Sequence, residues 1–254
     1  MDTKTSLNLF KKNWYIIFDL NSSDYQFLKT NIENSLLNLD GITQPIDINQ
    51  IHEQISNQDL NEQRIKLIQS FNKIDNLKKR IIDSAKDQID SLIGNELAIQ
   101  KNINLNIQIP HDESSHLPVH SDVWAGNSPF ELVLWIPFCD VYKSKSLFLL
   151  PKEKSLQYSQ LIANDPKYSI DNIANKEKGS LIWPELKEGQ AILFSHSLLH
   201  GNQINEENET RLSMNLRLKS LFTPYSTKGL GEFFEVYNMK PVNEIGLELS
   251  QSGN

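Results

Sequence analysis

The sequence predicts a mainly β fold of the jelly-roll type, supported by helices near its N-terminus. Two observations predict it. Apolar side chains recur at helical spacing through much of residues 1–95, whereas strand patterns dominate residues 96–225. Helices first and strands afterwards favour a sheet with helical support over an alternating α/β sheet. A chain of 254 residues can bury a sizeable core, so we expect one domain with a C-terminal extension over 226–254.

The N-terminal part, residues 1–95, is expected to be mainly helical. Trp14–Phe18 is a candidate added strand, and Ser22 or Ser23 can cap the helix that follows it. From about Asp59 to Ile93, apolar residues recur at steps of three and four, and Gly94 is the expected C-terminal stop. This pattern predicts one long helix or two consecutive helices that support one face of the sheet.

Three later segments have strand patterns. Residues 103–109 alternate between apolar and polar side chains, which predicts a half-buried strand. Residues 189–200 begin at a glycine and run through a short apolar stretch to His200, as in a buried strand that ends at a site. Residues 211–219 alternate with period two, so their polar face lines either solvent or the interior of a barrel. Only the interior position would make that face part of a site.

The residue types in His120-Ser121-Asp122, His200 and Arg211 indicate an iron site with a keto-acid co-substrate. In an extended strand, His120 and Asp122 would present their side chains on one face. Two neutral imidazoles and one carboxylate on one face of octahedral Fe(II) leave three positions open. A chelating 2-oxo acid can occupy two of them and O2 the third. An arginine fork such as that of Arg211 can hold the far carboxylate of the acid.

These segments resemble the Fe(II)/2-oxoglutarate-dependent oxygenases over roughly residues 107–225. The branch is the phytanoyl-CoA dioxygenase-like one, of the kind found in carbohydrate gene clusters and similar to a streptomycin-biosynthesis oxygenase. The resemblance implies a double-stranded β-helix, a cupin-like jelly-roll with N-terminal helices packed on the sheet. The matching segments are Leu117–Asp122, Phe130–Phe138, His200–Asn202 and Arg211–Ser213. The chain departs from the family at Pro151–Lys154, where relatives usually carry Pro-Gly-Ser-His.

The resemblance implies that His120, Asp122 and His200 bind iron and that Arg211 and Ser213 bind the distal carboxylate of 2-oxoglutarate. The implied reaction consumes O2, hydroxylates a C–H bond and releases succinate and CO2, with ascorbate as a stimulant. Desaturation, epimerisation and ring closure are alternative outcomes of the same chemistry. The resemblance also implies a small-molecule substrate, a carbohydrate or nucleotide sugar.

Several assignments stay open at this point. His196 and His200 would point the same way in one extended strand, so His196 is an alternative ligand, although the spacing to Arg211 favours His200. Arg217 shares the face of Arg211 and is a candidate for binding the co-substrate or an anionic substrate group, or is a solvated strand-edge charge. A cupin-like metal-dependent isomerase or hydrolase, or a non-catalytic sugar-binding jelly-roll, would have no need for Arg211.

Side chains just beyond the first ligands are candidate substrate contacts. Trp124, Asn127 and Glu131 supply aromatic, amide and carboxyl groups that suit a sugar, whereas Trp135 is expected in the core.

Composition limits the remaining classes. A net charge of -7 and a pI near 5.4 argue against a generic nucleic-acid binder, which needs a basic surface. The single cysteine, Cys139, excludes an intramolecular disulfide and suits a reducing compartment, and we expect it to be a small buried hydrophobe. The sequence has neither a signal-peptide pattern nor eighteen consecutive apolar residues, so we expect a cytoplasmic protein with no membrane or nucleic-acid partner. The pattern does not indicate an oligomeric state.

Overall fold

An antiparallel sheet of seven strands forms the centre of the computed structural model, which describes residues 3–55, 60–165, 167–170 and 172–252. Its order is β1-β6-β4-β8-β2-β9, and β3 also pairs with β8. A second sheet contains β5 and β7, which completes a double-stranded β-helix. The strands are β1 (Tyr15–Asp19), β2 (Leu97–Gln100), β3 (Asn104–Gln108), β4 (Glu131–Pro137), β5 (Phe148–Leu149), β6 (Gln190–Ser195), β7 (His200–Gly201), β8 (Arg211–Ser220) and β9 (Phe234–Asn238).

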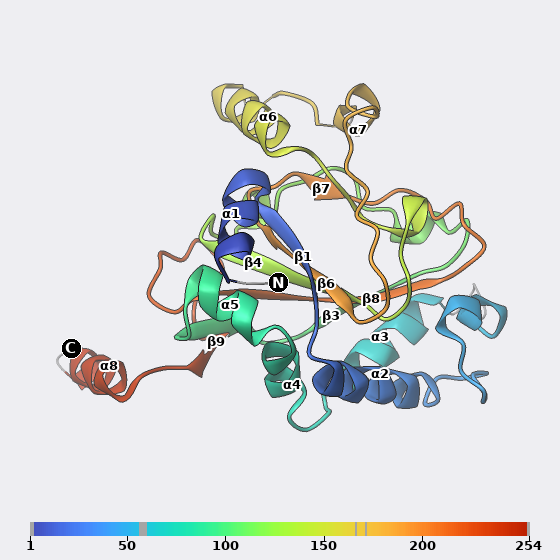
Figure 1. Cartoon of the computed structure of the whole chain (residues 1–254), viewed down its shortest axis with the longest axis horizontal. Coiled ribbons are helices and arrows are strands. Elements are labelled where there is room, and N and C mark those ends of the chain that lie inside the picture. The colour runs from blue at the N-terminus through green and yellow to red at the C-terminus, as the bar shows by residue number, and fades with distance from the viewer. Residues whose placement is uncertain (1–2, 56–59, 166, 171, 253–254) are drawn as a thin grey trace.

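The helices surround this sheet (Figure 1). They are α1 (Thr3–Asn13), α2 (Ser22–Leu36), α3 (Leu60–Phe71), α4 (Leu77–Ser84), α5 (Lys86–Ile93), α6 (Lys152–Asn164), α7 (Ile173–Lys176) and α8 (Pro241–Ser252). Two short 3-10 helices matter for the site and its surroundings, η1 (Ile48–Glu53) and η4 (Asp122–Ala125). None of the helices in the described part of the chain has the length and apolar character that crossing a membrane requires.

Strand β8 is the central strand of the main sheet, because it pairs with three other strands, β4, β2 and β3. Its apolar side chains are fully buried in the main core: Leu212, Met214, Leu216 and Leu218. On the opposite face, Arg211, Asn215 and Arg217 line an internal cavity. The polar face of 211–219 therefore lines the barrel interior, as the metal-site interpretation requires.

The N-terminal helices cover the outer face of the main sheet, where α2, α3 and α4 lie together (Figure 1). The expected added strand exists as β1, which pairs with β6. The cap of α2 differs from the prediction by one residue, because Asn21 accepts hydrogen bonds from the backbone of Ser23 and Asp24 at 3.1 and 3.2 Å. Helix α1 and strand β2 had no predicted counterpart.

The predicted one or two helices over 59–93 are three, α3, α4 and α5; position 59 itself lies outside the described residues. The first break follows Phe71, where the Asn72 amide bonds both the backbone N–H and C=O of Ile103, at 2.7 and 2.9 Å. This contact ties the end of α3 to the sheet. Asn76 then adopts a left-handed backbone, with φ of 59°, before α4. Periodicity alone did not reveal these breaks because the apolar spacing continues across them.

The predicted single strand over 189–200 is wrong. Strand β6 ends at Ser195, and a turn closed by a 3.0 Å hydrogen bond from Leu198 N to Ser195 O leads to β7. The chain changes sheets at this turn, because β6 belongs to the main sheet and β7 to the small one. As a result, His196 and His200 do not share the face of one strand.

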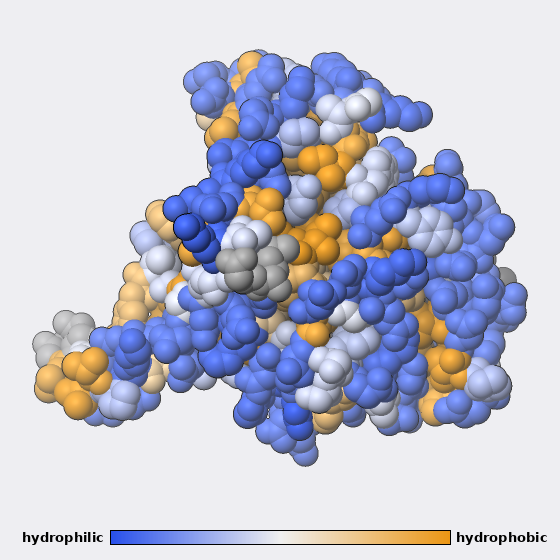
Figure 2. Space-filling view, viewed as in Figure 1, coloured by the Kyte–Doolittle hydropathy of each residue, from blue (hydrophilic) through white to orange (hydrophobic). Residues whose placement is uncertain are grey.

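Helices α6 and α7 rise above the small sheet at the top of Figure 1. They pack on a second apolar cluster that includes Phe148, Tyr158, Ile173 and Leu199. Figure 2 shows hydrophobic residues between this raised part and the polar surface below it. Helix α6 begins at Lys152, so the segment that departs from the family motif forms a helix start here.

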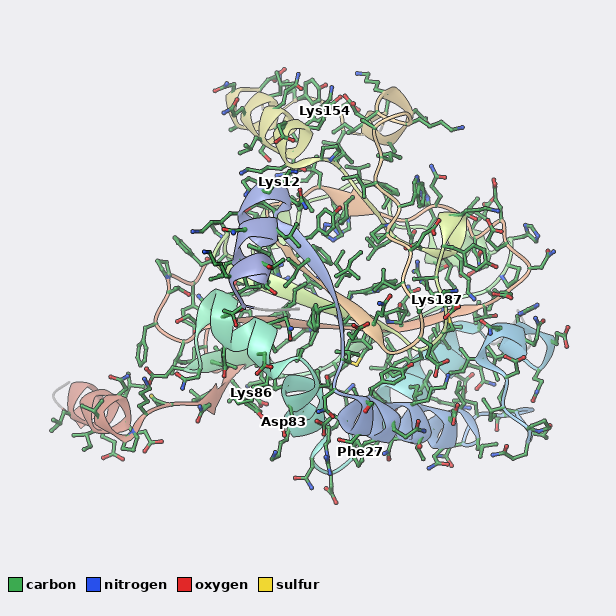
Figure 3. All side chains as sticks on the ribbon, in the orientation of Figure 1. Lys12, Phe27, Asp83, Lys86, Lys154 and Lys187 are labelled. Atoms are coloured by element: carbon green, nitrogen blue, oxygen red, sulfur yellow. The ribbon has the colours of Figure 1, made fainter. Side chains whose placement is uncertain are left out.

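The surface is polar over most of the visible face (Figure 2), and Figure 3 shows charged side chains such as Lys12 and Lys86, both exposed, on the outer helices. Helix α8 projects from the body, and its Val242 and Ile245 are 70% and 58% exposed. Cys139 is buried and unpaired with any other cysteine, as expected. The division of the chain at residues 95 and 225 stays a prediction.

Candidate metal centre

The structure brings His120, Asp122 and His200 together. One ligand atom from each lies within 4.8 Å of the others, and no other such group of three occurs in the described residues. His120 Nε2 is 3.8 Å from Asp122 Oδ1, and the two imidazole rings are 4.3 Å apart between centroids. Asp122 is the first residue of η4 rather than part of an extended strand.

The two histidines are held by their backbones and by one ring nitrogen each. His120 and His200 exchange N–H to C=O hydrogen bonds of 2.9 Å, which fixes one opposite the other. His120 Nδ1 lies 2.9 Å from the Pro118 carbonyl, and His200 Nδ1 lies 2.9 Å from the Leu198 carbonyl. A carbonyl oxygen only accepts, so each Nδ1 carries a proton, and the neutral form of each ring presents the lone pair of Nε2. This is the tautomer that a metal ligand needs.

Gly201 and Asn202 clamp the segment before His120 against β7. A Cβ on Gly201 would lie 2.7 Å from the Leu117 carbonyl oxygen and 2.8 Å from the Phe148 ring, so only glycine allows this close approach. Asn202 Oδ1 accepts from Leu117 N at 2.6 Å, and its Nδ2 donates to Ser115 O at 3.0 Å. Both contacts fix the first histidine relative to the second.

The protonation states fit metal binding. Burial, followed by the nearby His120, lowers the pKa of His200 to about 4, so its imidazole is neutral near pH 7. Burial by itself would raise the pKa of Asp122, but His200 and Arg217 together hold it well below its usual range. The site therefore offers two imidazole nitrogens and one carboxylate oxygen, the donor set of a non-haem iron site with open positions.

A cavity of about 90 Å3 adjoins the three candidate ligands. It is lined by Asn106, Leu117, His120, Asp122, Val133, Trp135, Leu147, Phe194, His200, Gly201, Asn202, Arg211, Asn215 and Arg217. The candidate metal ligands and the candidate carboxylate-binding arginine thus face one space.

Arg211 is buried on the inner face of β8 with unused hydrogen-bonding capacity. Its Nη2 donates to Asn106 Oδ1 at 2.9 Å and its Nη1 to Lys145 O at 3.4 Å, and the Trp135 ring lies 5.8 Å away. Its Nε and the hydroxyl of Ser213 have no hydrogen-bond partner among the described residues. Burial lowers the pKa of Arg211 to about 10, which leaves it cationic near pH 7. A buried cation with unpaired donors fits a carboxylate.

The structure also places the three residues whose roles the sequence left open or assigned to the core, His196, Arg217 and Trp135. His196 is fully buried, and its Nε2 lies 3.8 Å from Asp122 Oδ2, but it does not belong to the three-residue group. Arg217 pairs with Asp122, with Nη2 2.9 Å from Oδ1 and Nε 3.3 Å from Oδ2. Its interpretation as a solvated edge charge is therefore wrong. Trp135 is buried as expected, yet it also lines the cavity.

The candidate substrate contacts divide into two groups. Asn127 and Glu131 are buried and bond within the protein, to the Asp122 carbonyl at 3.0 Å and to Ser128 N at 2.8 Å. Trp124 lies in η4, two residues after Asp122, and is 37% exposed. Of these three side chains, only Trp124 stays available to a ligand at the surface.

Sequence reasoning missed Asn106 and Asn202. Asn106 lies on the polar face of 103–109, where the polar positions carry amides rather than charges. Uncharged amides at every second position favour an interior polar face over a solvated one. That pattern was the signal that could have placed Asn106 beside Arg211.

The comparisons with known proteins give structural relatives alone. No protein-family model and no curated protein sequence matches the chain. EctD from S. alaskensis has a TM-score of 0.56 at 16% identity, covering 89% of this chain and 79% of that one. HygX from Streptomyces hygroscopicus, with nickel and 2-oxoglutarate bound, has 0.53 at 10%, covering 89% and 90%. The epimerase SnoN from nogalamycin biosynthesis, described as α-ketoglutarate-dependent and non-heme, has 0.52 at 14%, covering 90% and 88%. The chain therefore has the fold of these proteins.

Proposed function

We propose that the chain is an Fe(II)- and 2-oxoglutarate-dependent dioxygenase that acts on a small molecule. The observation that carries this proposal is the convergence of His120, Asp122 and His200 on the same cavity as Arg211, whose Nε is unpaired as far as the described residues show. HygX supports it, because its structure holds a metal ion and 2-oxoglutarate in the same fold. Bound iron would use O2 to convert 2-oxoglutarate into succinate and CO2, and would thereby supply the oxidant that hydroxylates a C–H bond.

The protein's own residues would bind, orient and exclude water. His120 and His200 would offer Nε2, since their Nδ1 atoms are held by carbonyl groups. Arg211 and Ser213 would hold the distal carboxylate of 2-oxoglutarate through Nε and the hydroxyl, which have no partner in the part of the chain that the structure describes. The apolar walls Val133, Leu147 and Phe194 would keep bulk water from the reacting groups.

We propose a carbohydrate or sugar-derived substrate as the first class to test, and this choice rests on the family resemblance. Trp124 supports it, since an exposed indole two residues from a candidate ligand offers an apolar face for a sugar ring. Hydroxylation is the expected outcome. Epimerisation, the activity named for SnoN, is the alternative with the same requirements.

The test is anaerobic titration of the iron-loaded protein with 2-oxoglutarate, followed by measurement of succinate formed after O2 is admitted. Ascorbate is included to keep iron reduced, and panels of sugars and nucleotide sugars are compared with a no-substrate control. We expect saturable 2-oxoglutarate binding, and succinate formation that rises with the correct substrate. Iron-loaded protein that binds no 2-oxoglutarate would instead favour a cupin-like isomerase or hydrolase, and failure to bind metal would leave the sugar-binding module.

A further inference from the structure

Both carboxylate oxygens of Asp122 already have neighbours other than the two candidate histidine ligands. The Arg217 guanidinium approaches them side-on, with Nη2 2.9 Å from Oδ1 and Nε 3.3 Å from Oδ2. The imidazole of His196 lies near Oδ2, with Nε2 3.8 Å away. The Asp122 side chain is only 4% exposed, so these neighbours decide which directions remain open to it.

Arg217 has further contacts within the protein, and His196 is enclosed. Gln100 Oε1, which is buried, accepts from the backbone N–H of Arg217 at 3.3 Å and from its Nη1 at 3.4 Å. His196 Nδ1 lies 3.3 Å from Glu131 Oε2, and both of these side chains are fully enclosed. Arg217 cannot withdraw without breaking its contacts with Gln100, whereas His196 is confined by burial, since its ring nitrogens have no hydrogen-bond partner among the described residues.

We propose that Arg217 is a positioning residue that restricts Asp122 to binding the metal through one oxygen, with His196 closing the space behind the other. This inference rests on the proposed function. Oδ1 lies 3.8 Å from His120 Nε2 and also accepts from Arg217 Nη2, whereas Oδ2 lies near both Arg217 Nε and His196 Nε2. Carboxylates bind cations with either one or two oxygens, so the surroundings decide which mode occurs.

The binding mode of Asp122 sets the number of positions left for reactants. With two imidazoles and one carboxylate oxygen, an octahedral ion keeps three open positions, enough for a chelating 2-oxo acid and one further ligand. A carboxylate that chelates with both oxygens would leave two. The Arg217 cation also lies against the carboxylate, so it weakens the attraction between Asp122 and a dication. Arg217 thus lowers metal affinity and preserves open positions.

An alternative role for Arg217, binding an anionic group of a substrate or co-substrate, is less well supported. Its Nη2 and Nε are directed at Asp122 and its Nη1 at Gln100. Each nitrogen of the guanidinium therefore has a partner within the protein. In contrast, Nε of Arg211 has none among the described residues.

The test uses the full chain loaded with Mn(II), whose effect on water proton relaxation reports the number of exchangeable waters on the metal. Arg217→Met removes the charge and all donors, and Arg217→Lys keeps the charge but not the fork. Lys228→Met is the matched control, because Lys228 is a nearby cation whose ammonium lies over the Phe233 ring, 4.7 Å from its centroid, instead of on Asp122. Circular dichroism confirms that each variant is folded.

We expect wild type and Lys228→Met to show three exchangeable waters. Arg217→Met should show two, a fall of about one third in the inner-sphere relaxation, together with Mn(II) binding at least threefold tighter. Arg217→Lys should also show two waters, because one ammonium cannot hold both oxygens, but its Mn(II) affinity should rise less because the positive charge is kept. A purely structural role would weaken metal binding instead. Three waters in both Arg217 variants, or weaker binding in both, would overturn the proposal.

The test separates this inference from the proposed function, because it needs neither 2-oxoglutarate nor turnover. Mn(II)-loaded wild type with three waters but no affinity for 2-oxoglutarate would reject the dioxygenase and leave the role of Arg217 standing. If Arg217→Met loses 2-oxoglutarate affinity while keeping three waters, Arg217 is an anion site and the inference is wrong.

Discussion

Replacing Arg211 by alanine should weaken 2-oxoglutarate binding more than any change elsewhere on β8. The guanidinium is buried at the cavity and carries an Nε with no partner among the described residues. Arg211→Ala removes this donor together with the positive charge that would face the distal carboxylate. Arg211→Lys keeps the charge and loses the paired geometry, so we expect an intermediate loss of about tenfold.

The magnitude follows from the donors that remain available. Nη2 and Nη1 already contact Asn106 Oδ1 and Lys145 O, at 2.9 and 3.4 Å, so the co-substrate would gain Nε and share one Nη. Hydrogen bonds to charged groups contribute about 1.5–3 kcal/mol each. Two at the lower end give about 3 kcal/mol, or on the order of a hundredfold in Kd.

The assay is anaerobic isothermal titration of 2-oxoglutarate into protein loaded with Fe(II). Arg80→Ala is the control, because Arg80 is a half-exposed arginine that pairs with Asp24 on the outer helices. Metal binding measured in parallel shows whether the centre survives, since Arg211→Ala leaves Asn106 without its donor. An Arg211→Ala protein that is folded, binds metal and keeps its 2-oxoglutarate affinity within threefold of wild type would refute the reasoning.

Three further predictions concern the centre and its support. His200→Ala should abolish Fe(II)-dependent succinate formation while His196→Ala keeps it measurable, and the opposite result would exchange their roles. Burial raises the pKa of Glu131 from 4.5 to about 7. The folded protein therefore holds this proton more tightly than the unfolded chain, so stability falls as pH rises from about 4.5 to 7, by at most about 3 kcal/mol. Glu131→Gln should flatten that part of the pH profile in urea denaturation, and an unchanged slope would contradict the burial argument. Gly201→Ala should destabilise the protein by about 2 kcal/mol or more and weaken metal binding, because the added Cβ would lie 2.7 Å from the Leu117 oxygen. An unchanged melting temperature would contradict this prediction, because it would show that the strand shifts without loss of stability.

The sequence predicted the elements whose pattern is local. The alternation over 211–219 placed Leu212 and its neighbours in the core and Arg211 on the opposite face, and the structure has both. The residues of the centre were found because His-x-Asp and the later histidine keep a recognisable spacing to the arginine. Their convergence, however, depends on β7 lying beside the segment before His120. The local sequence pattern does not specify which strands pair with one another.

The errors have physical causes of the same kind. Apolar residues stand on both sides of the turn within 189–200, so periodicity could not reveal that the chain leaves one sheet at Ser195 and joins the other at His200. The helix break at Asn72 involves a side-chain contact with Ile103, a residue 31 positions away. The partnership of Arg217 with Asp122 joins residues that are 95 positions apart, and nothing in either segment indicates it.

A crystal structure of the protein grown anaerobically with Fe(II) and 2-oxoglutarate would test the central claim most directly. The account predicts one cation bound by His120 Nε2, His200 Nε2 and a single oxygen of Asp122, with the far carboxylate of the keto acid against Arg211. A cation bound elsewhere, or a keto acid that leaves the Arg211 guanidinium untouched, would contradict it.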